Sequence, residues 1–424
     1  MLAVASAVTL SLTACGGDDS GGEDASTEIT GKGPITFVTG KDTSGFVQGV
    51  LDKWNADHPD EQVRLIELPE SADAQRSQMI ANAQTESDEY DVLNLDVVWT
   101  AEFAANRYVI PLPEDEFPLD QMLEPVVETA KYLDKVYSIP VQSDGGLLYY
   151  RTDLLKAAGV SEPPKTWDEM KEICEKVQAT PEGKNVACYA GQFEKYEGLT
   201  VNAAEAINSA GGVITDESGK PNVNTEEAAA GLDFLVQSFE DGTIPKEGIT
   251  YMEEQGRRAF QEGRLLFHRQ WPYQYALANG EGSKVVDKFA VAPLPGLDGP
   301  GVSSLGGHNL GISTYSKNKE TALEFIKFYS NLENNRDYVV TASQAPVYTE
   351  LYEDEELNKQ LPFLSILGDS IANAQPRPKV VNYGDATIAI QDAAYAALTG
   401  DMSTEEALEQ LQGDLEEITA DQQG

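Results

Sequence analysis

Histidine, cysteine and positive charge are all scarce in this sequence. Its 424 residues include 3 His and 3 Cys, and 30 Lys and Arg stand against 71 Asp and Glu, which gives a formal net charge of -41 at pH 7. So large a negative charge argues against nucleic acid or anionic lipid as a binding partner. The length suggests two lobes of ordinary domain size rather than one compact domain.

Recognisable catalytic and metal-binding motifs are also missing. The histidines His58, His268 and His308 are scattered, and no HExxH, paired CxxC or EF-hand spacing predicts a metal site. We find no GxSxG nucleophile elbow, no GxxxxGKS/T phosphate loop and no GxGxxG motif that opens a helix. We therefore expect no metal and no cofactor. A glycoside hydrolase stays open as an alternative, because it needs only two carboxylates at a suitable separation.

The apolar run at the N-terminus, Leu2 to Ala14, is too short to span a bilayer as a permanent helix. It is typical of an export signal, and because it lacks a basic n-region we expect the true translation start upstream of Met1. The residues LTAC, which end at Cys15, resemble the lipobox of bacterial lipoproteins, so residues 1–14 are predicted to be a signal segment and Cys15 to be lipidated. A chance cysteine is the alternative.

Residues 15–33 contain almost nothing apolar to bury, which predicts a flexible tether. A lipid anchor, a tether and an acidic globular body together place the protein on the outer face of a bacterial cell membrane. In an oxidising compartment the remaining cysteines, Cys174 and Cys188, are expected to form a disulfide. Two separate buried thiols are the alternative.

Short apolar strands alternate with helical patterns over the first hundred residues of the body, which predicts an α/β fold. Residues 90–99 are apolar enough for a central parallel strand buried on both faces. Ligands bind outside the carboxyl ends of such strands, where Asp96 and Trp99 lie. The expected strands are 34–40, 61–68 and 90–99, and the expected helices lie within 44–59 and 74–85.

Helix starts and apolar faces are also readable further along the chain. The apolar residues of 321–333 lie on one helical face, and so do those after Ser403, which predicts that the C-terminus docks as a helix. Pairs with capping-box spacing are Thr166 and Glu169, Asn224 and Glu227, and Ser403 and Glu406.

The stretch FHRQWPYQY, Phe267 to Tyr275, is too irregular for a plain core strand or helix. Flat aromatic rings stack on the C–H faces of sugars, and polar groups pair with sugar hydroxyls. Trp271 and Tyr273, held by Pro272 in a loop, are therefore candidates for a stacking wall. The alternative is that these rings fill the interface between two lobes without touching a ligand.

Several motifs together resemble family 1 extracellular solute-binding proteins of bacterial ABC sugar importers, most closely the trehalose/maltose-binding lipoproteins. Besides the lipobox, they are YDVLNLDVVWTAEFAANRYVIPL, YSIPVQSDGGLLYYRTDLL, YEGL, FHRQWPYQY and GGHNLGIS. The resemblance implies a two-lobed periplasmic-binding-protein fold of type II, with a mainly parallel sheet in each lobe and a multi-strand hinge. The implied bounds are 34–141 and 293–342 for lobe 1, 142–292 and 343–424 for lobe 2, and 139–142, 292–295 and 342–347 for the crossings.

The resemblance also implies a set of ligand contacts, carried over motif by motif. They are Asp96, Trp99, Asp144, Tyr196, Glu197, Trp271, Gly306, Gly307, Asn309 and Arg377, to which the stacking argument adds Tyr273. Relatives often carry Asn where this chain has Gln270, and Trp where it has His308, so the sugar need not be trehalose or maltose. Structural roles are the alternatives: a helix cap for Asp96 or Glu197, a turn for Asp144 and loop order for Arg377.

A membrane-anchored binding role follows from the resemblance. The implied protein is a monomeric, non-enzymatic lipoprotein that captures a di- or oligosaccharide between its lobes and delivers it to the permease subunits of an ABC importer. The alternatives are a secreted glycoside hydrolase and a sugar-sensing receptor lipoprotein.

Overall fold

The structure is a computed structural model that describes residues 27–216 and 218–420. The predicted signal segment, Cys15 and the tether as far as residue 26 lie outside the described residues. Within the described part of the chain, no helix is both long and apolar enough to cross a membrane.

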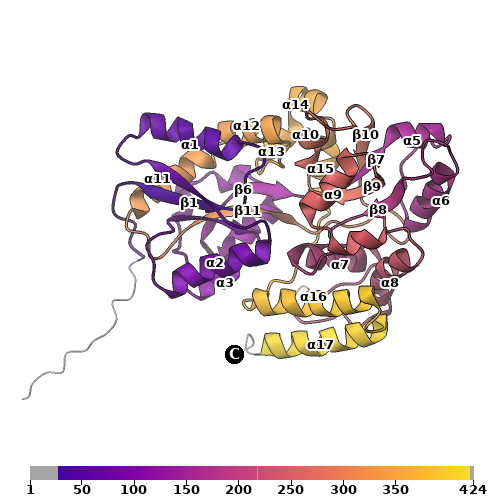
Figure 1. The fold of residues 1–424 in the computed structure, drawn as a ribbon. Helices are drawn as coiled ribbons and strands as arrows, with labels where there is room; N and C mark the ends of the chain where they lie inside the picture. Colours follow the sequence, from indigo (N-terminus) through magenta and orange to yellow (C-terminus); the bar gives the residue numbers. More distant parts are fainter. Residues whose placement is uncertain (1–26, 217, 421–424) are drawn as a thin grey trace, which may run out of the picture.

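Two sheets flanked by helices form the two lobes of the molecule, with α1, α2 and α11 around the first sheet and α5, α6 and α9 around the second (Figure 1). The five-stranded sheet has the order β2-β1-β3-β11-β6, and the four-stranded sheet has the order β10-β7-β9-β8. The strands are β1 Ile35–Thr39, β2 Val63–Glu67, β3 Val92–Asp96, β4 Lys131–Tyr132, β5 Lys135–Val136, β6 Ser138–Asp144, β7 Leu147–Arg151, β8 Ala187–Ala190, β9 Leu265–Gln270, β10 Phe289–Ala292 and β11 Gly306–Ile312.

Helices connect these strands, and the last two, α16 and α17, lie beneath α7 and α8 (Figure 1). The helices are α1 Phe46–Asp57, α2 Ala72–Gln84, α3 Thr100–Ala105, α4 Glu124–Val127, α5 Thr152–Ala157, α6 Trp167–Gln178, α7 Glu197–Ser209, α8 Glu226–Glu240, α9 Glu253–Gln261, α10 Gln274–Ala278, α11 Lys319–Tyr329, α12 Leu332–Ala342, α13 Thr349–Glu353, α14 Glu355–Gln360, α15 Phe363–Ala372, α16 Tyr383–Thr399 and α17 Thr404–Ala420. Short 3-10 turns are η1 Glu114–Glu116, η2 Leu119–Gln121, η3 Glu128–Ala130 and η4 Lys246–Thr250.

The two-lobed architecture is as predicted, but the sheets are mixed rather than mainly parallel. In the first sheet β1 pairs in parallel with β2 and β3, whereas β11 runs antiparallel to both β3 and β6. In the second sheet β7 runs antiparallel to β9 and β10, and the pair formed by β8 and β9 is parallel. The antiparallel β11 follows from its connection, because the chain returns from the second sheet and enters the first against the direction of β3.

The predicted elements of the first lobe are present with shifted ends. The apolar residues Phe46, Val50, Leu51 and Trp54 form the buried face of α1. The strand predicted at 90–99 pairs only over β3, because the chain leaves the sheet at Val97 to enter α3. This exit places Asp96 at the carboxyl end of a central strand.

Two of the three predicted capping boxes are confirmed. The N–H and side chain of Thr166 exchange hydrogen bonds with Glu169, and those of Ser403 do so with Glu406. The third is wrong by one residue, because the side chain of Thr225 rather than Asn224 accepts the capping bond, from the N–H of Ala228.

The single helix expected at 321–333 is also wrong. The chain forms α11, which ends at Tyr329, and α12, which begins at Leu332. The side chain of Asn331 accepts a hydrogen bond from the N–H of Asn334, so a new helix start interrupts the apolar periodicity. The docked C-terminal helix is confirmed in α17, where Leu411 and Leu415 are buried.

Cys174 on α6 and Cys188 on β8 form the predicted disulfide across a sequence separation of 14. Closing a loop of this size restricts the unfolded chain, so its loss is expected to lower the free energy of unfolding by about 3 kcal/mol. Urea unfolding with and without dithiothreitol measures this loss. A Cys174→Ser/Cys188→Ser variant is the control, because its unfolding midpoint should equal that of the reduced protein, with or without the reductant. An unfolding midpoint that reductant leaves unchanged in the native protein would contradict the prediction.

Candidate functional site

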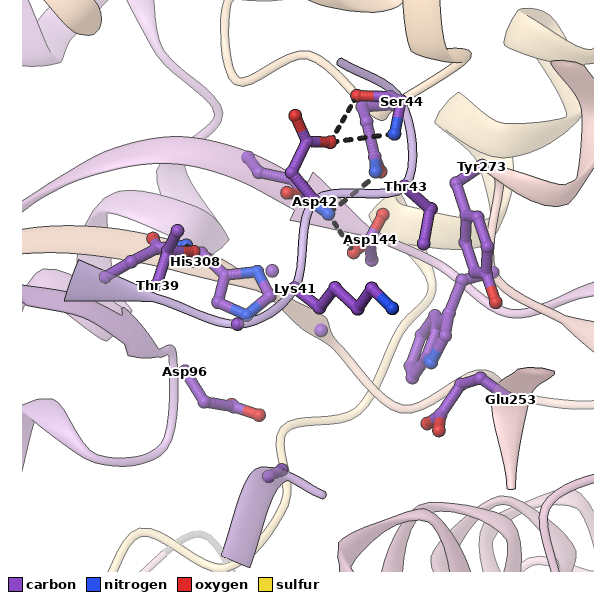
Figure 2. A pocket seen from close by; sticks show the side chains of 18 of the residues that line it. Thr39, Lys41, Asp42, Thr43, Ser44, Asp96, Asp144, Glu253, Tyr273 and His308 are labelled. Carbon is purple, nitrogen blue, oxygen red and sulfur yellow. Dashed lines mark hydrogen bonds between the residues drawn. The ribbon is translucent and has the colours of Figure 1, made fainter. Parts of the chain in front are cut away.

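A cavity of about 500 Å³ is lined by residues of both lobes, a size typical of small-molecule sites. From the first lobe come the loop after β1, the ends of β3 and β6 and the start of β11. From the second come the start of α7, α9 and the segment after β9. Figure 2 shows Asp96, Glu253 and Tyr273 around one hollow, with Lys41 reaching into it.

Ten of the eleven predicted contact residues line this cavity. They are Asp96, Trp99, Asp144, Tyr196, Glu197, Trp271, Tyr273, Gly306, Gly307 and Arg377. The exception is Asn309, which is fully buried and donates a hydrogen bond from Nδ2 to the hydroxyl of Thr129 at 3.0 Å. Since side chains alternate along a strand, the residue after His308 on β11 faces away from the cavity. The expected contact by Asn309 is therefore corrected to a structural role.

Trp271 and Tyr273 lie in an irregular segment between β9 and α10, as expected, whereas Phe267 to Gln270 belong to the buried strand β9. The hydroxyl of Tyr149 donates to the carbonyl oxygens of residues 271 and 272 at 3.1 and 3.0 Å, which anchors the segment. A Cβ at Gly306 would lie 3.0 Å from the indole of Trp271. Glycine at 306 therefore lets the indole lie against β11.

A buried ion cluster spans the cavity between β3 and α7. Arg377 donates from Nη2 to Asp96 Oδ1 at 2.7 Å and from Nη1 to Glu197 Oε1 at 2.5 Å. Glu197 also accepts hydrogen bonds from Tyr383 and Thr387 on α16. Burial raises the pKa of Glu197, and Arg377 opposes that rise. Arg377 is thus a buried cation in the loop between α15 and α16, and the carboxylate of Glu197 accepts hydrogen bonds from this cluster rather than capping a helix.

The first turn of α7 is instead capped from the other lobe. The N–H of Glu197 donates to Asp73 Oδ2 at 2.7 Å, and Gln391 on α16 donates to Asp73 Oδ1 at 3.3 Å. A carboxylate is favourable at a helix N-terminus, where N–H groups lack partners within the helix. Together with the pair formed by Asp96 and Arg377, these bonds hold the two lobes against each other beside the cavity.

Asp144, at the end of β6, has an oxygen without a partner. Its Oδ2 accepts from Gln142 Nε2 at 2.7 Å, whereas its buried Oδ1 has no hydrogen-bond partner among the described residues. The buried Nδ1 of His308, which also lines the cavity, likewise has no hydrogen-bond partner among the described residues. Burial raises the pKa of Asp144 to about 7 and lowers the pKa of His308, which keeps the imidazole neutral. Unpaired buried polar atoms beside a cavity are suited to hydrogen bonds with a bound molecule.

Asp144→Asn is expected to stabilise the unliganded protein at pH 8 by on the order of 4 kcal/mol and to change it little near pH 4. The folded-state pKa is raised, so the native protein binds more protons than the unfolded chain between about pH 4 and 7, and its stability falls as pH rises. Urea unfolding of both proteins at the two pH values tests this. An equal difference at pH 4 and pH 8 would contradict it.

Sequence reasoning missed part of the cavity lining. Lys41 and Asp42 lie within three residues of the carboxyl end of β1, so the rule that located Asp96 also applied to them. Glu253, Glu254 and Arg258 on α9 carry no such signal, because the fold alone brings that helix to the cavity. Within the described residues, no group of three or more His, Cys, Asp and Glu is placed to hold a metal ion.

Comparison with known proteins matches residues 39–336 to the family described as bacterial extracellular solute-binding protein. The chain belongs to this family. It is 33% identical over 393 residues to a "Probable ABC transporter-binding protein" of Deinococcus radiodurans, covering 91% of this chain and 93% of the relative. A "Galactooligosaccharide-binding protein" of Bacillus subtilis is 24% identical over 429 residues and is covered over 93% of its length.

Among solved structures, the maltose-bound MalE3 of T. maritima superposes with a TM-score of 0.86 at 33% identity, over 91% of this chain and 99% of that one. This likeness confirms the two-lobed type II fold. Membership of the family confirms the resemblance drawn from the motifs, to extracellular solute-binding proteins of bacterial ABC sugar importers.

Proposed function

We propose that the protein captures a di- or oligosaccharide of the trehalose/maltose class in the cavity between its lobes and delivers it to the permease of an ABC importer. It does so as a monomer without catalysing a reaction, held on the outer face of the membrane by a lipid on Cys15. The observation that carries the proposal is the lining of the cavity, where an aromatic wall meets buried carboxylates and a buried guanidinium. The 33% identity to a protein crystallised with maltose supports this sugar class.

The cavity offers both kinds of contact that a sugar requires. The ring of Trp271 supplies a flat apolar face for the C–H groups of a pyranose. Asp144 Oδ1 and His308 Nδ1 have no hydrogen-bond partner within the described part of the chain, so hydroxyls of the sugar can satisfy them. Because these groups come from different lobes, the full set of contacts forms only when the lobes are together, and the ligand thereby favours the closed state.

We also propose the lobe bounds that the resemblance implied, 34–141 with 293–342 and 142–292 with 343–424. The chain passes from β6 in the first sheet to β7 in the second within three residues, so residues 142–144, which these bounds assign to lobe 2, still pair with β11 in the first sheet. The chain returns between β10 and β11. The third connection links α12 to α13, next to Ser343 at φ 54°. Three connections between the sheets, of which that between β6 and β7 is the shortest, suit a hinge.

The experiment that tests the function is a thermal-shift screen of the purified protein against maltose, trehalose, maltotriose, cellobiose, lactose, raffinose, mannitol, amino acids and peptides. A ligand that binds only the folded state stabilises it by roughly 2.7 kcal/mol at a hundredfold excess over Kd. Chromatography of the sugar afterwards should show no consumption, whereas a glycoside hydrolase would consume it. A shift with a peptide alone would overturn the proposal. Mass spectrometry of the full-length protein from a bacterial membrane tests the lipid on Cys15.

A further inference from the structure

We infer that Arg269, paired with Glu205, is the positioning residue of the binding face: it fixes the indole of Trp271 and ties that ring to two of the connections between the lobes. The inference rests on the proposed function in one respect, since it takes Trp271 as the surface on which the sugar stacks. Arg269 and Glu205, unlike Trp271, do not themselves line the cavity.

The guanidinium of Arg269 stacks directly on the indole. Its Cζ lies 3.8 Å from the centre of the Trp271 ring, and its side chain is only 1% exposed. A buried guanidinium over an indole face makes a favourable cation–π contact. Because this contact covers one face of the ring, a ligand in the cavity stacks on the opposite face, whose direction Arg269 therefore sets.

The guanidinium itself is held on every side. Arg269 donates from Nε to Glu205 Oε2 at 2.7 Å, from Nη2 to Glu205 Oε1 at 2.5 Å and from Nη1 to Gln192 Oε1 at 3.0 Å. Gln192 closes the ring of contacts by donating to the carbonyl oxygen of Arg269 at 3.1 Å. This bidentate ion pair fixes the plane of the guanidinium, whereas the ammonium group of a lysine could not form such a pair.

Glu205 carries the same network to the connections between the sheets. Its Oε1 accepts from the N–H of Ser304 at 3.1 Å and from the hydroxyl of Ser303 at 3.3 Å, in the segment between β10 and β11. The N–H of Gly146, between β6 and β7, donates to the hydroxyl of Ser303 at 2.6 Å. A Cβ at Gly146 would lie 2.8 Å from both Arg269 Nη2 and Glu205 Oε1, so only glycine permits this approach.

The stacking ring and two hinge connections therefore share one buried ion pair. A displacement of the indole by a sugar acts on Arg269, and through Glu205 on residues 146, 303 and 304. If the ion pair only stabilised the packing of β9 against α7, its removal would change neither the order of the indole nor the affinity for sugar. These two roles predict different results for the same variant.

The test uses the double variant Glu205→Gln/Arg269→Met. Removing Arg269 alone would leave a buried carboxylate without its counter-ion, so both charges are removed together. Maltose is the probe, and its Kd is measured by isothermal titration calorimetry. We expect binding roughly 10-fold weaker than in the unmodified protein, the size of effect that one well-made buried contact has on Kd.

The readout specific to positioning is the near-ultraviolet circular dichroism of Trp271. It is obtained by subtracting the spectrum of the Trp271→Phe variant, in the unmodified background and again in the double-variant background. An indole fixed by Arg269 gives a difference spectrum that is largely lost in the double variant. Arg269→Lys, which keeps the charge without the two-pronged geometry, should give intermediate affinity and intermediate signal.

A matched control is Arg151→Met/Asp153→Asn. Arg151 is likewise a buried arginine on the second sheet, with Asp153 Oδ1 accepting from its Nε at 2.8 Å, but it does not line the cavity or touch Trp271. This control should leave both the Kd and the difference spectrum unchanged.

If Glu205→Gln/Arg269→Met also leaves both unchanged, the positioning role is overturned. If the unmodified protein binds neither maltose nor any other sugar, the proposed function fails, and the spectrum alone decides whether Arg269 positions the ring.

Discussion

Trp271→Ala is expected to weaken maltose binding by roughly 30-fold or more. A buried aromatic anchor at the centre of a binding site contributes about 2 kcal/mol or more when it is truncated, and 1.4 kcal/mol corresponds to a factor of ten in Kd. The indole is anchored by Arg269 on one side and lies against Gly306, so its loss removes a preformed surface and not a mobile side chain. Isothermal titration calorimetry with maltose measures the change.

Two further variants separate stacking from general damage to the fold. Trp271→Phe keeps a flat ring and should recover much of the lost affinity. Trp54→Phe alters a buried tryptophan of α1 that does not line the cavity, so it should leave Kd unchanged. Full affinity in Trp271→Ala would refute the proposed stacking wall.

The ends of strands explain why much of the cavity was predictable. Asp96 ends an apolar run that predicts a buried strand, and the carboxyl end of such a strand faces the ligand side of the sheet. The irregular spacing around Trp271 similarly indicates a loop between regular elements. Such local signals locate a site, but Asn309 shows their limit: a motif names neighbouring residues, and the alternation of the strand decides which of them reach the cavity.

Long-range arrangement was not predictable in the same way. The antiparallel course of β11 and the mixed pairing of the second sheet depend on connections that the local pattern does not encode. Asp73 lies in a helix whose polar sequence predicts exposure to solvent, yet its carboxylate caps α7 from the opposite lobe. The break between α11 and α12 arises because the cap at Asn331 outweighs a continuous apolar periodicity.

Arg377→Met is expected to destabilise the fold by roughly 3–5 kcal/mol at neutral pH and to abolish sugar binding. The variant leaves Asp96 and Glu197 facing each other across the cavity without the cation that both of them bind. Only 2% of the Arg377 side chain is exposed, so solvent cannot replace its charge. Urea unfolding measures the loss of stability, and calorimetry with maltose measures the loss of binding.

The pH dependence of that loss distinguishes a missing counter-ion from a missing side-chain volume. Burial already raises the pKa of Glu197, and Arg377 restrains that rise, so the pKa climbs further in Arg377→Met. A carboxyl whose folded-state pKa lies above its unfolded value costs no stability below the unfolded value and costs most once the pH exceeds the folded one. The deficit should therefore be small near pH 4 and largest at pH 8.

The triple variant Asp96→Asn/Glu197→Gln/Arg377→Met supplies the control for this interpretation. With all three charges removed, no carboxylate is left without a counter-ion, so most of the stability lost in Arg377→Met should return at pH 8 while sugar binding stays lost. Equal deficits for Arg377→Met at both pH values, or no recovery in the triple variant, would mean that Arg377 acts through packing. Recovery of stability without recovery of binding would instead show that the ligand site needs this charge cluster and that the fold does not.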